Sequence, residues 1–245
     1  MAADNLKQDF DRDGVVVLRG LIDAGTLADW RFDWDVFSRK PRTPGFNPVE
    51  VNGPFPATLS DLYRYPPLLD AVCEVFGPDI ALYNYRFVVK DEHSRNAVFL
   101  HQDTCYHVGW PTKLSAFVAL SEVNDGNGPL RFYKGSYQFG YMGDAGELGR
   151  APMPNPWFQP RLAAGDVVLM HSATWHESGE LNCGPTRVLA DCIFQPANDP
   201  SGIELLRGEW RCTPQPWLRS SNLFVRSRTS RLTEMQKKLK DAGIE

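Results

Sequence analysis

Between residues 80 and 196 the chain alternates between short apolar segments and turns rich in glycine, asparagine and aspartate. Short strands at this spacing, with few helical patterns among them, are typical of a sandwich or jelly roll and not of alternating α/β folds. The sequence therefore predicts a mainly β core. The expected strands are 81–90, 97–103, 114–120, 129–133, 166–171 and 186–194.

The flanks of this β region carry the helical patterns. Residues 14–20 form a short apolar segment between two glycines, which predicts a buried strand, and the apolar spacing over 24–37 predicts a helix after it. A second helix is expected over 66–76, where two prolines suit the first turn and a glycine follows. The basic tail predicts an extended segment and then a solvated helix over 231–242.

The length of the chain indicates a single domain. A chain of 245 residues that is 42% hydrophobic can bury one sizeable core but is short for two full domains. Within it we expect an N-terminal part with strand, helices and a lid loop (1–79), a jelly-roll core (80–196) and a C-terminal extension with a helix (197–245).

Charge and composition exclude several function classes. The net charge is -4, so the field of the whole molecule gives no attraction to nucleic acid or to an anionic membrane. The chain has no apolar run of eighteen residues and no secretory type of N-terminus. A small-molecule substrate is the better expectation, and the sequence carries no signal for an oligomeric state. Five cysteines with no Cys-x-x-Cys pair fit a reducing cytoplasm.

All five histidines lie in or beside the predicted strands: His93, His101, His107, His171 and His176. In His101-Gln102-Asp103 the imidazole and the carboxylate are two residues apart, so on a strand they point to the same side. A third ligand would come from His171 or His176, at and just past the end of a later apolar strand. Two histidines and one carboxylate form the facial triad of non-haem Fe(II) oxygenases, which leaves coordination positions open.

Arg187 is unusual because it begins an apolar predicted strand. A guanidinium there is costly without an anionic partner, and Asp191 on the same face lies about 13 Å along the strand. A dicarboxylate bound to the metal at one end could present its far carboxylate to this arginine, whose planar fork suits it. The alternatives are that Arg187 points outward or pairs with a remote acid.

Taken together, these motifs resemble the phytanoyl-CoA dioxygenase (PhyH) family of Fe(II)/2-oxoglutarate oxygenases. The matching features are GVVVLRG at 14–20, HQD at 101–103, NGPL at 127–130, KGSY at 134–137, Gly165-Asp166, and His176 with Ser178, Gly179 and Arg187. The resemblance implies a double-stranded β-helix of the cupin type with flanking α-helices, and an oxygenase that uses Fe(II), 2-oxoglutarate and O2. It implies iron bound by His101, Asp103 and His176, and 2-oxoglutarate anchored by Arg187 with Ser178.

The resemblance also assigns roles to neighbouring residues. It selects His176 over His171 as the distal ligand and leaves His171 outside the ligand set. Gln102 corresponds to a position that often touches the cosubstrate, with an outward polar residue as the alternative. Phe117 matches an aromatic near the cosubstrate but is expected first in the core. The carboxylate of Asp103 argues for hydroxylation over halogenation, because related halogenases have a small residue there.

The chain departs from the usual family motifs around the expected substrate pocket, where Tyr137, Trp175 and Glu177 are candidate lining residues. His107 is expected either to contact substrate or to be solvated. Loops 41–56, 104–112 and 140–160 are expected to close over the site.

On the strand before the HQD motif, alternation places Tyr83 and Tyr85 on one face and Arg86 and Lys90 on the other, so that one pair could face substrate. Asp191 is expected to accept a hydrogen bond from substrate or to pair with another buried group.

The expected reaction is hydroxylation of a small molecule with decarboxylation of 2-oxoglutarate to succinate and CO2. Two alternatives stay open. The first is a cupin-type metalloprotein that is not an oxygenase, and the second is the same enzyme class performing desaturation or cyclisation of a specialised metabolite.

Overall fold

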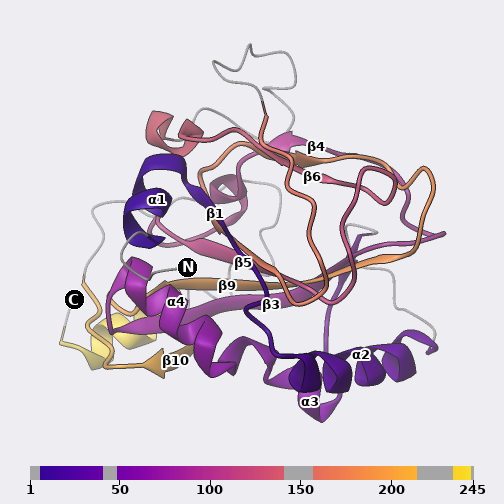
Figure 1. Ribbon diagram of the computed structural model, residues 1–245. Helices are drawn as coiled ribbons and strands as arrows, with labels where there is room; N and C mark the ends of the chain where they lie inside the picture. The colour runs from indigo at the N-terminus through magenta and orange to yellow at the C-terminus, as the bar shows by residue number, and fades with distance from the viewer. Residues whose placement is uncertain (1–5, 41–48, 141–156, 214–233, 244–245) are drawn as a thin grey trace.

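The computed structural model describes residues 6–40, 49–140, 157–213 and 234–243. They form two antiparallel sheets that face each other (Figure 1), as in a double-stranded β-helix. The large sheet has the order β1-β7-β5-β9-β3-β10, with β2 paired to β3, and the small sheet has the order β4-β8-β6. The strands are β1 Val15–Leu18, β2 Glu50–Val51, β3 Ile80–Lys90, β4 Val98–His101, β5 Leu114–Ala119, β6 Leu130–Phe132, β7 Val167–His171, β8 His176–Ser178, β9 Arg187–Pro196 and β10 Glu204–Arg207.

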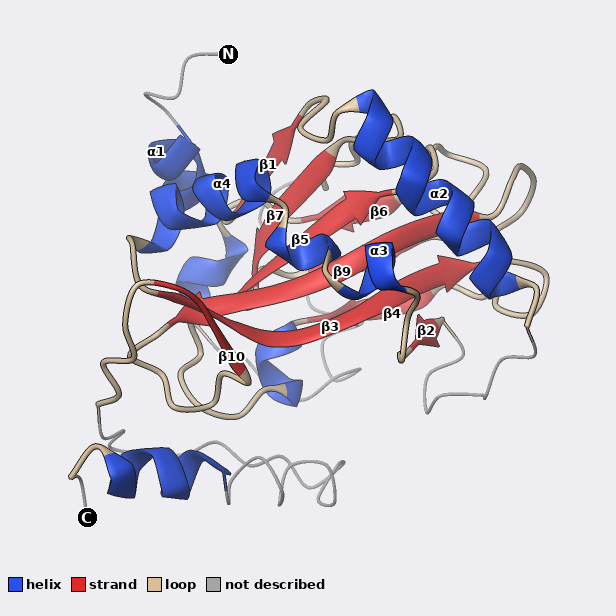
Figure 2. Ribbon diagram, turned by 90° about the horizontal axis from the view of Figure 1, so that it is seen from below, coloured by secondary structure: helices blue, strands red, loops and turns tan. Residues whose placement is uncertain are grey.

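Helices cover the outer face of the large sheet, and the small sheet lies on its other side (Figures 1 and 2). The α-helices are α1 Leu6–Asp13, α2 Ala24–Ser38, α3 Ala57–Ser60 and α4 Pro66–Phe76, and 3-10 turns occur at η2 Leu62–Arg64, η3 Asp103–Tyr106 and η4 Ser136–Phe139. Asp23 caps α2 by accepting from the backbone N–H of Thr26, which satisfies one of the free donors of the first turn. None of the helices in these ranges is long and apolar enough to cross a membrane.

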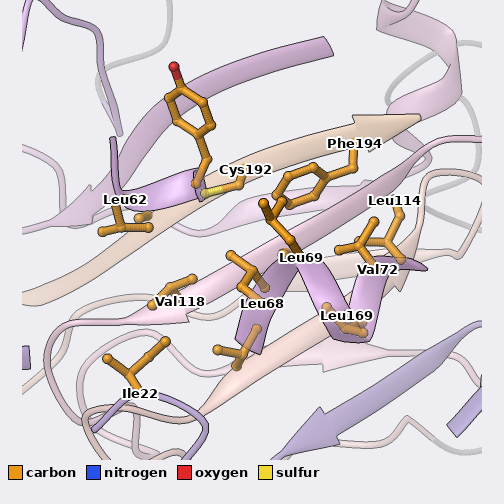
Figure 3. Close-up of a cluster of buried hydrophobic side chains, with 14 of the residues drawn as sticks. Ile22, Leu62, Leu68, Leu69, Val72, Leu114, Val118, Leu169, Cys192 and Phe194 are labelled. Carbon is orange, nitrogen blue, oxygen red and sulfur yellow. The ribbon is translucent and has the colours of Figure 1, made fainter. Parts of the chain in front are cut away.

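Two apolar layers hold these elements together. The outer layer lies between the helices and the large sheet, where Leu68 and Val72 of α4 pack with Cys192 and Phe194 of β9 (Figure 3). The inner layer lies between the two sheets and joins residues such as Leu189 of β9 to Phe132 of β6. Successive residues of a strand point to opposite faces, so every second residue of β9 faces the interior between the sheets.

The sequence predictions for the main elements are confirmed. The helices expected over 24–37 and 66–76 correspond to α2 and α4, and each expected strand has a counterpart within a few residues. The sheet also takes β1 from the N-terminal part and β10 from the C-terminal part. Five short helices and strands were missed, namely α1, β2, α3, β8 and β10, because two to four residues carry too little periodicity and α1 is strongly polar.

Two predictions on strand geometry are wrong. The strand expected over 97–103 ends at His101, and Asp103 instead begins the 3-10 turn η3. Tyr83 and Tyr85 do not share a face, because the pairing of β3 with β9 shifts between Leu82 and Asn84. This irregularity turns Tyr83 toward the interior beside Ile193, while Tyr85 packs in the outer layer.

Parts of the expected lid loops and tail lie outside the described residues. Of loop 41–56 the structure describes 49–56, which includes β2 and therefore is not free of regular structure. Of loop 140–160 it describes Gly140 and 157–160. In the C-terminal extension residues 234–241 are helical, but this helix is not wholly solvated, because Met235 packs against Tyr83 and Val108.

Candidate metal centre

Three side chains from the small sheet and its edge meet at one point. His101 ends β4, His176 begins β8, and the two residues are register partners in the small sheet. Asp103 Oδ1 lies 3.5 Å from His101 Nε2 and 3.7 Å from His176 Nε2. Ligands about 2.0–2.2 Å from a metal can be at most roughly 4.4 Å apart, so one ion fits among these atoms. Within the described residues this is the group of histidine, cysteine and acidic side chains that could hold a metal.

The backbone presets both imidazoles for metal binding. His101 Nδ1 lies 2.7 Å from the carbonyl oxygen of Phe99, and His176 Nδ1 lies 2.9 Å from that of Thr174. A carbonyl only accepts, so each Nδ1 carries the proton and each Nε2 offers its lone pair to the centre. Burial lowers the pKa of His176 to about 4, which keeps this imidazole neutral at pH 7.

Asp103 is held as a charged carboxylate. Burial raises its pKa, but the imidazoles lower it by more whenever they are protonated, first through the charge of His176 and then through the hydrogen bond and charge of His101, and the resulting pKa lies well below its usual range. Ser115 on β5 donates a hydrogen bond to Asp103 Oδ2 at 3.3 Å. Although the strand ends early, Gln102 keeps an extended backbone, so His101 and Asp103 still converge. No pattern in the sequence pointed to Ser115.

Arg187 begins β9 and is fully buried. Its Nη1 donates to the carbonyl oxygen of Gly128, whereas Nε and Nη2 have no hydrogen-bond partner among the described residues. Burial lowers the pKa of Arg187 to about 9. The alternative that the guanidinium points outward is therefore wrong, and no acid among the described residues pairs with it. A buried charge whose donors lack partners is costly, and an anion is the kind of group that would satisfy it.

The surroundings of Arg187 add a second cation and a free hydroxyl. Lys90 of β3, the register partner of Arg187, is fully buried and donates to the carbonyl oxygen of Asn96. Burial, and then the charge of Arg187, lowers the pKa of Lys90 to about 8. Ser178 Oγ on β8 is also buried without a partner among the described residues. The backbone must approach closely here, because a Cβ on Gly128 would lie 2.2 Å from Lys90 Cδ.

The other family-matched residues are distributed as follows. Gln102 is buried, so the alternative of an outward residue is wrong, and its amide donates to the carbonyl oxygens of Gly140 and Ala173, each at 2.7 Å. Phe117 lies in the core between the sheets, as expected. His171 is outside the triad, and its ring lies 4.7 Å from that of Tyr137.

The candidate pocket residues are largely committed to contacts within the protein. Trp175 is buried, and Glu177 pairs with Arg131 at 3.2 Å. Tyr137 donates its hydroxyl to the carbonyl oxygen of Asp11 in α1. The expectation that His107 could be solvated is wrong, because the residue is buried with its ring 4.8 Å from that of Tyr83.

Two polar clusters in the interior were not found from the sequence as units. In the first, Arg86 of β3 binds Asp191 of β9 and Glu50 of β2. Arg86 and Lys90 are thus the pair of β3 that faces inward, and Asp191 pairs with Arg86 instead of Arg187. Charged residues on separate strands give no periodic signal, and only the register brings them together.

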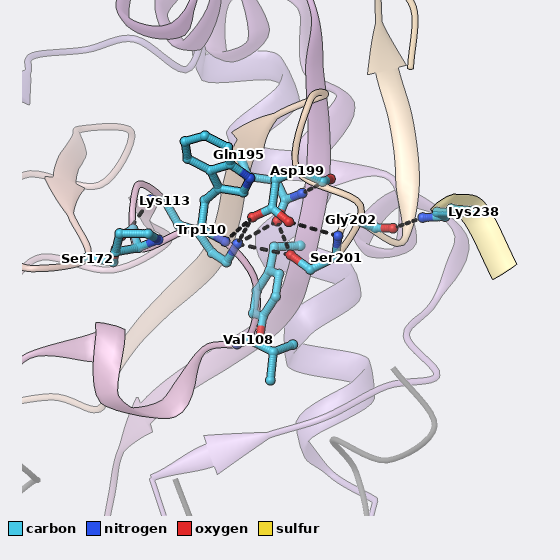
Figure 4. Close-up of polar contacts among 11 residues, drawn as sticks. Val108, Trp110, Lys113, Ser172, Gln195, Asp199, Ser201, Gly202 and Lys238 are labelled. Atoms are coloured by element: carbon cyan, nitrogen blue, oxygen red, sulfur yellow. Dashed lines mark hydrogen bonds and ion pairs between the residues drawn. The ribbon is translucent and has the colours of Figure 1, made fainter. Parts of the chain in front are cut away.

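The second cluster surrounds Lys113, which is fully buried just before β5 (Figure 4). Its ammonium contacts Asp199 at 2.5 Å, Gln195 at 2.8 Å and Ser201 at 3.0 Å. Asp199 also accepts from the backbone N–H of Trp110 at 2.8 Å. This network connects residues 110–113, which follow Asp103 in the chain, to Gln195 near the end of β9 and to Asp199 just after it.

Comparison with known proteins agrees with this geometry. A family model for phytanoyl-CoA dioxygenase (PhyH) matches residues 10–187. The L-proline trans-4-hydroxylase of Streptomyces griseoviridis is 28% identical over 101 residues, which are 39% of this chain and 38% of that protein. The chain therefore spans well under half of that relative.

Solved structures show the same fold. EctD from S. alaskensis, solved with 2-oxoglutarate and 5-hydroxyectoine, has a TM-score of 0.70 at 19% identity, with 89% of this chain and 82% of that chain covered. The epimerase SnoN, solved with Fe3+, alpha ketoglutarate and nogalamycin RO, has a TM-score of 0.68 at 20% identity, with 80% and 84% covered. The chain thus has the double-stranded β-helix fold of these enzymes, and it belongs to the phytanoyl-CoA dioxygenase (PhyH) family.

Proposed function

We propose that this protein is an Fe(II)- and 2-oxoglutarate-dependent dioxygenase that oxidises a small molecule. The observation that carries the proposal is the fully buried guanidinium of Arg187, two of whose nitrogens have no partner in the described segments, in the same fold that gathers a His-Asp-His triad. An anion that binds a metal at one end and the arginine at the other would explain both the triad and the unpartnered guanidinium nitrogens. A keto acid with a second carboxylate is such a ligand.

The triad suits Fe(II). Two neutral imidazole nitrogens and one carboxylate oxygen are the ligand set of non-haem Fe(II) oxygenases, and three protein ligands leave positions for a chelating cosubstrate and for O2. In the proposal His101, Asp103 and His176 hold the iron. The hydrogen bonds from their Nδ1 atoms orient the two rings, and Ser115 orients the carboxylate.

The anchor suits 2-oxoglutarate. In the proposal Arg187 binds the carboxylate remote from the metal through Nε and Nη2, and the Ser178 hydroxyl donates to the same group. Lys90 strengthens the positive potential there. Gln102 is proposed as a cosubstrate-binding residue. Its amide donates hydrogen bonds to the backbone carbonyl oxygens of Gly140 and Ala173, which fix its position.

The protein's own part in the reaction is to bind, orient and exclude water. When bound, the iron would activate O2, which is the oxidant: one oxygen atom would enter succinate as 2-oxoglutarate is oxidised with loss of CO2, and the other would oxidise the substrate. The buried triad and anchor place that chemistry between two sheets. A desolvated guanidinium holds its carboxylate more strongly than one in water, which fixes the cosubstrate before substrate arrives.

Hydroxylation is the proposed outcome, because the relative from Streptomyces griseoviridis is named a hydroxylase. Cyclisation stays as the second outcome, since the carbocyclase SnoK has the same fold at a TM-score of 0.62 and 17% identity over 81% of this chain and 85% of that chain. We place the protein in the cytoplasm because its five cysteines are free thiols.

The rival of a cupin-type metalloprotein that is not an oxygenase gives no role to Arg187. An anaerobic titration with Fe(II) and 2-oxoglutarate separates the two, because chelation of Fe(II) by the keto acid produces a weak visible charge-transfer band. We expect the band with wild type. We expect Asp103→Ala to lose both iron and the band, and Arg187→Ala to keep iron but need much more 2-oxoglutarate. Absence of the band in wild type with all components present would refute the proposal.

A further inference from the structure

The inner face of the large sheet carries a charged cluster that neither the metal nor the cosubstrate anchor uses. Arg86 of β3 and Asp191 of β9 are direct register partners, so their side chains leave the sheet on the same side. Leu189, two residues before Asp191, belongs to the apolar layer between the sheets, which places Asp191 on the interior face. The cluster therefore faces the space that contains the triad.

Asp191 is almost completely buried, at 1% exposure, and only half satisfied. Its Oδ2 accepts from Arg86 Nε at 2.9 Å, whereas its Oδ1 has no hydrogen-bond partner in the described part of the chain. Leaving a buried carboxylate oxygen without a donor is costly, so a group that supplies one is favoured at this place. Burial raises the pKa of Asp191 to about 6, with the Arg86 charge opposing this rise.

The cluster is close to the metal ligands. Ser115, which donates to Asp103, is the register partner of Ile193, and Asp191 is two residues along the same face of β9. Two residues of a strand span about 7 Å. The charge of Asp103 accordingly helps to raise the pKa of Asp191. For Arg86, burial lowers the pKa, but the neighbouring carboxylates, Asp103 among them, raise it by more. A molecule that reaches Asp191 therefore reaches the neighbourhood of the triad.

The charge of the cluster identifies the kind of group that fits. Arg86 is shared between Asp191 and Glu50, the latter through a contact of 2.7 Å, so one guanidinium faces two carboxylates. The sum is one net negative charge. The free carboxylate oxygen of Asp191 repels an anion such as the cosubstrate. A cationic N–H donor instead neutralises the charge of this carboxylate and donates a hydrogen bond to its oxygen. Glu50 is 24% exposed, so the cluster is reachable from its side.

We propose that Asp191 determines substrate specificity, and that its free carboxylate oxygen accepts a hydrogen bond from a protonated amine of the substrate. This inference rests on the proposed dioxygenase function and adds the substrate class. Arg86 and Glu50 are positioning residues in this account, because Arg86 fixes the orientation of the Asp191 carboxylate and Glu50 fixes Arg86.

The test uses ring compounds that share a skeleton and differ in one group. Cyclohexylamine, cyclohexanol and cyclohexanecarboxylate, with the matching cyclopentane set, are titrated into the anaerobic complex of the whole protein with Fe(II) and 2-oxoglutarate. The shift of the charge-transfer band gives each Kd. We expect the amine of each set to bind wild type more tightly than the alcohol and the carboxylate. Asp191→Asn should raise the Kd of the amine about tenfold or more, because it removes a charge-assisted hydrogen bond.

Two further variants keep the test decisive. Glu50→Gln, at a half-buried position, should weaken amine binding a few-fold even if Asp191→Asn does not fold. Asp70→Asn removes the same charge from an Asp–Arg pair at the surface, with Arg207 at 2.6 Å, and should leave amine binding unchanged.

Each outcome bears on a defined claim. Amines that bind no better than their alcohols, amines that fail to bind wild type, or amine binding that survives both Asp191→Asn and Glu50→Gln would overturn the specificity role. Absence of the charge-transfer band in wild type would instead overturn the dioxygenase proposal, and the substrate inference with it.

Discussion

Replacing Arg187 by methionine should stabilise the empty protein while abolishing the effect of 2-oxoglutarate. Two guanidinium nitrogens lie buried without partners among the described residues, and each such group costs about 1–3 kcal/mol. The substitution keeps the length of the side chain and gives up one hydrogen bond to Gly128, which is worth about 0.5–3 kcal/mol. With about 2 kcal/mol for each of the two nitrogens and about 2 kcal/mol for the lost bond, the net change is a gain of about 2 kcal/mol, which for a chain of this size raises the Tm by about 4–8 °C.

The assay is a thermal melt of metal-free protein, followed by anaerobic melts with Fe(II) and with or without 2-oxoglutarate. At one hundred times its Kd, 2-oxoglutarate should stabilise wild type by about 2.7 kcal/mol and the Arg187→Met variant hardly at all. Arg19→Met is the matched control, because Arg19 is partnered, with Asp166 at 2.6 Å. This control should not gain stability and should keep its response to 2-oxoglutarate.

A lower Tm for metal-free Arg187→Met would show that the guanidinium is satisfied in the empty protein. An unchanged response to 2-oxoglutarate would show that this arginine is not the anchor. Either result would refute the reasoning.

Three other outcomes are expected. Gly128→Ala should lower the free energy of unfolding by more than about 1 kcal/mol in urea melts, because the backbone φ is +87° and the new Cβ would press on Lys90; unchanged stability would contradict the close packing. The hydrogen bond from Arg12 lowers the pKa of Asp13 to about 2, below its unfolded value, so this contribution is present above about pH 4 and is lost as the pH falls toward 2. Wild type should thus lose more Tm than Asp13→Asn between pH 5 and pH 3, and parallel curves would exclude the effect. Asp103→Ala should retain less than one tenth of the bound iron in metal analysis after dialysis, and full retention would place the metal elsewhere.

The proximity of His101 and Asp103 was predictable because its signal is local. His101 and Asp103 are two residues apart, and the extended backbone of Gln102 between them keeps their side chains convergent although Asp103 begins a 3-10 turn. The choice of His176 over His171 came from the family resemblance, because the strand that carries it, β8, has only three residues. A lone arginine in an apolar segment also singled out Arg187, which the structure buries completely.

The features that could not be predicted from the sequence, such as the face of Tyr83 and the partners of Arg86, depend on the register of strand pairing. The shift in pairing between Leu82 and Asn84 reverses the face of every residue before it, so the expectation for Tyr83 failed while that for Arg86 and Lys90 held. The contacts of Arg86 with Asp191 and Glu50 join three strands that are far apart in the chain. Such contacts depend on which strands become neighbours, and alternation along a single strand does not encode that.

The measurement that tests the central claim most directly is a crystal structure of the protein grown anaerobically with Fe(II) and 2-oxoglutarate, with anomalous data at the iron edge. The account predicts one iron peak among His101 Nε2, Asp103 Oδ1 and His176 Nε2, and 2-oxoglutarate reaching from it to Arg187 Nε and Nη2. An iron peak away from these three atoms, or 2-oxoglutarate that leaves Arg187 without a partner, would contradict it.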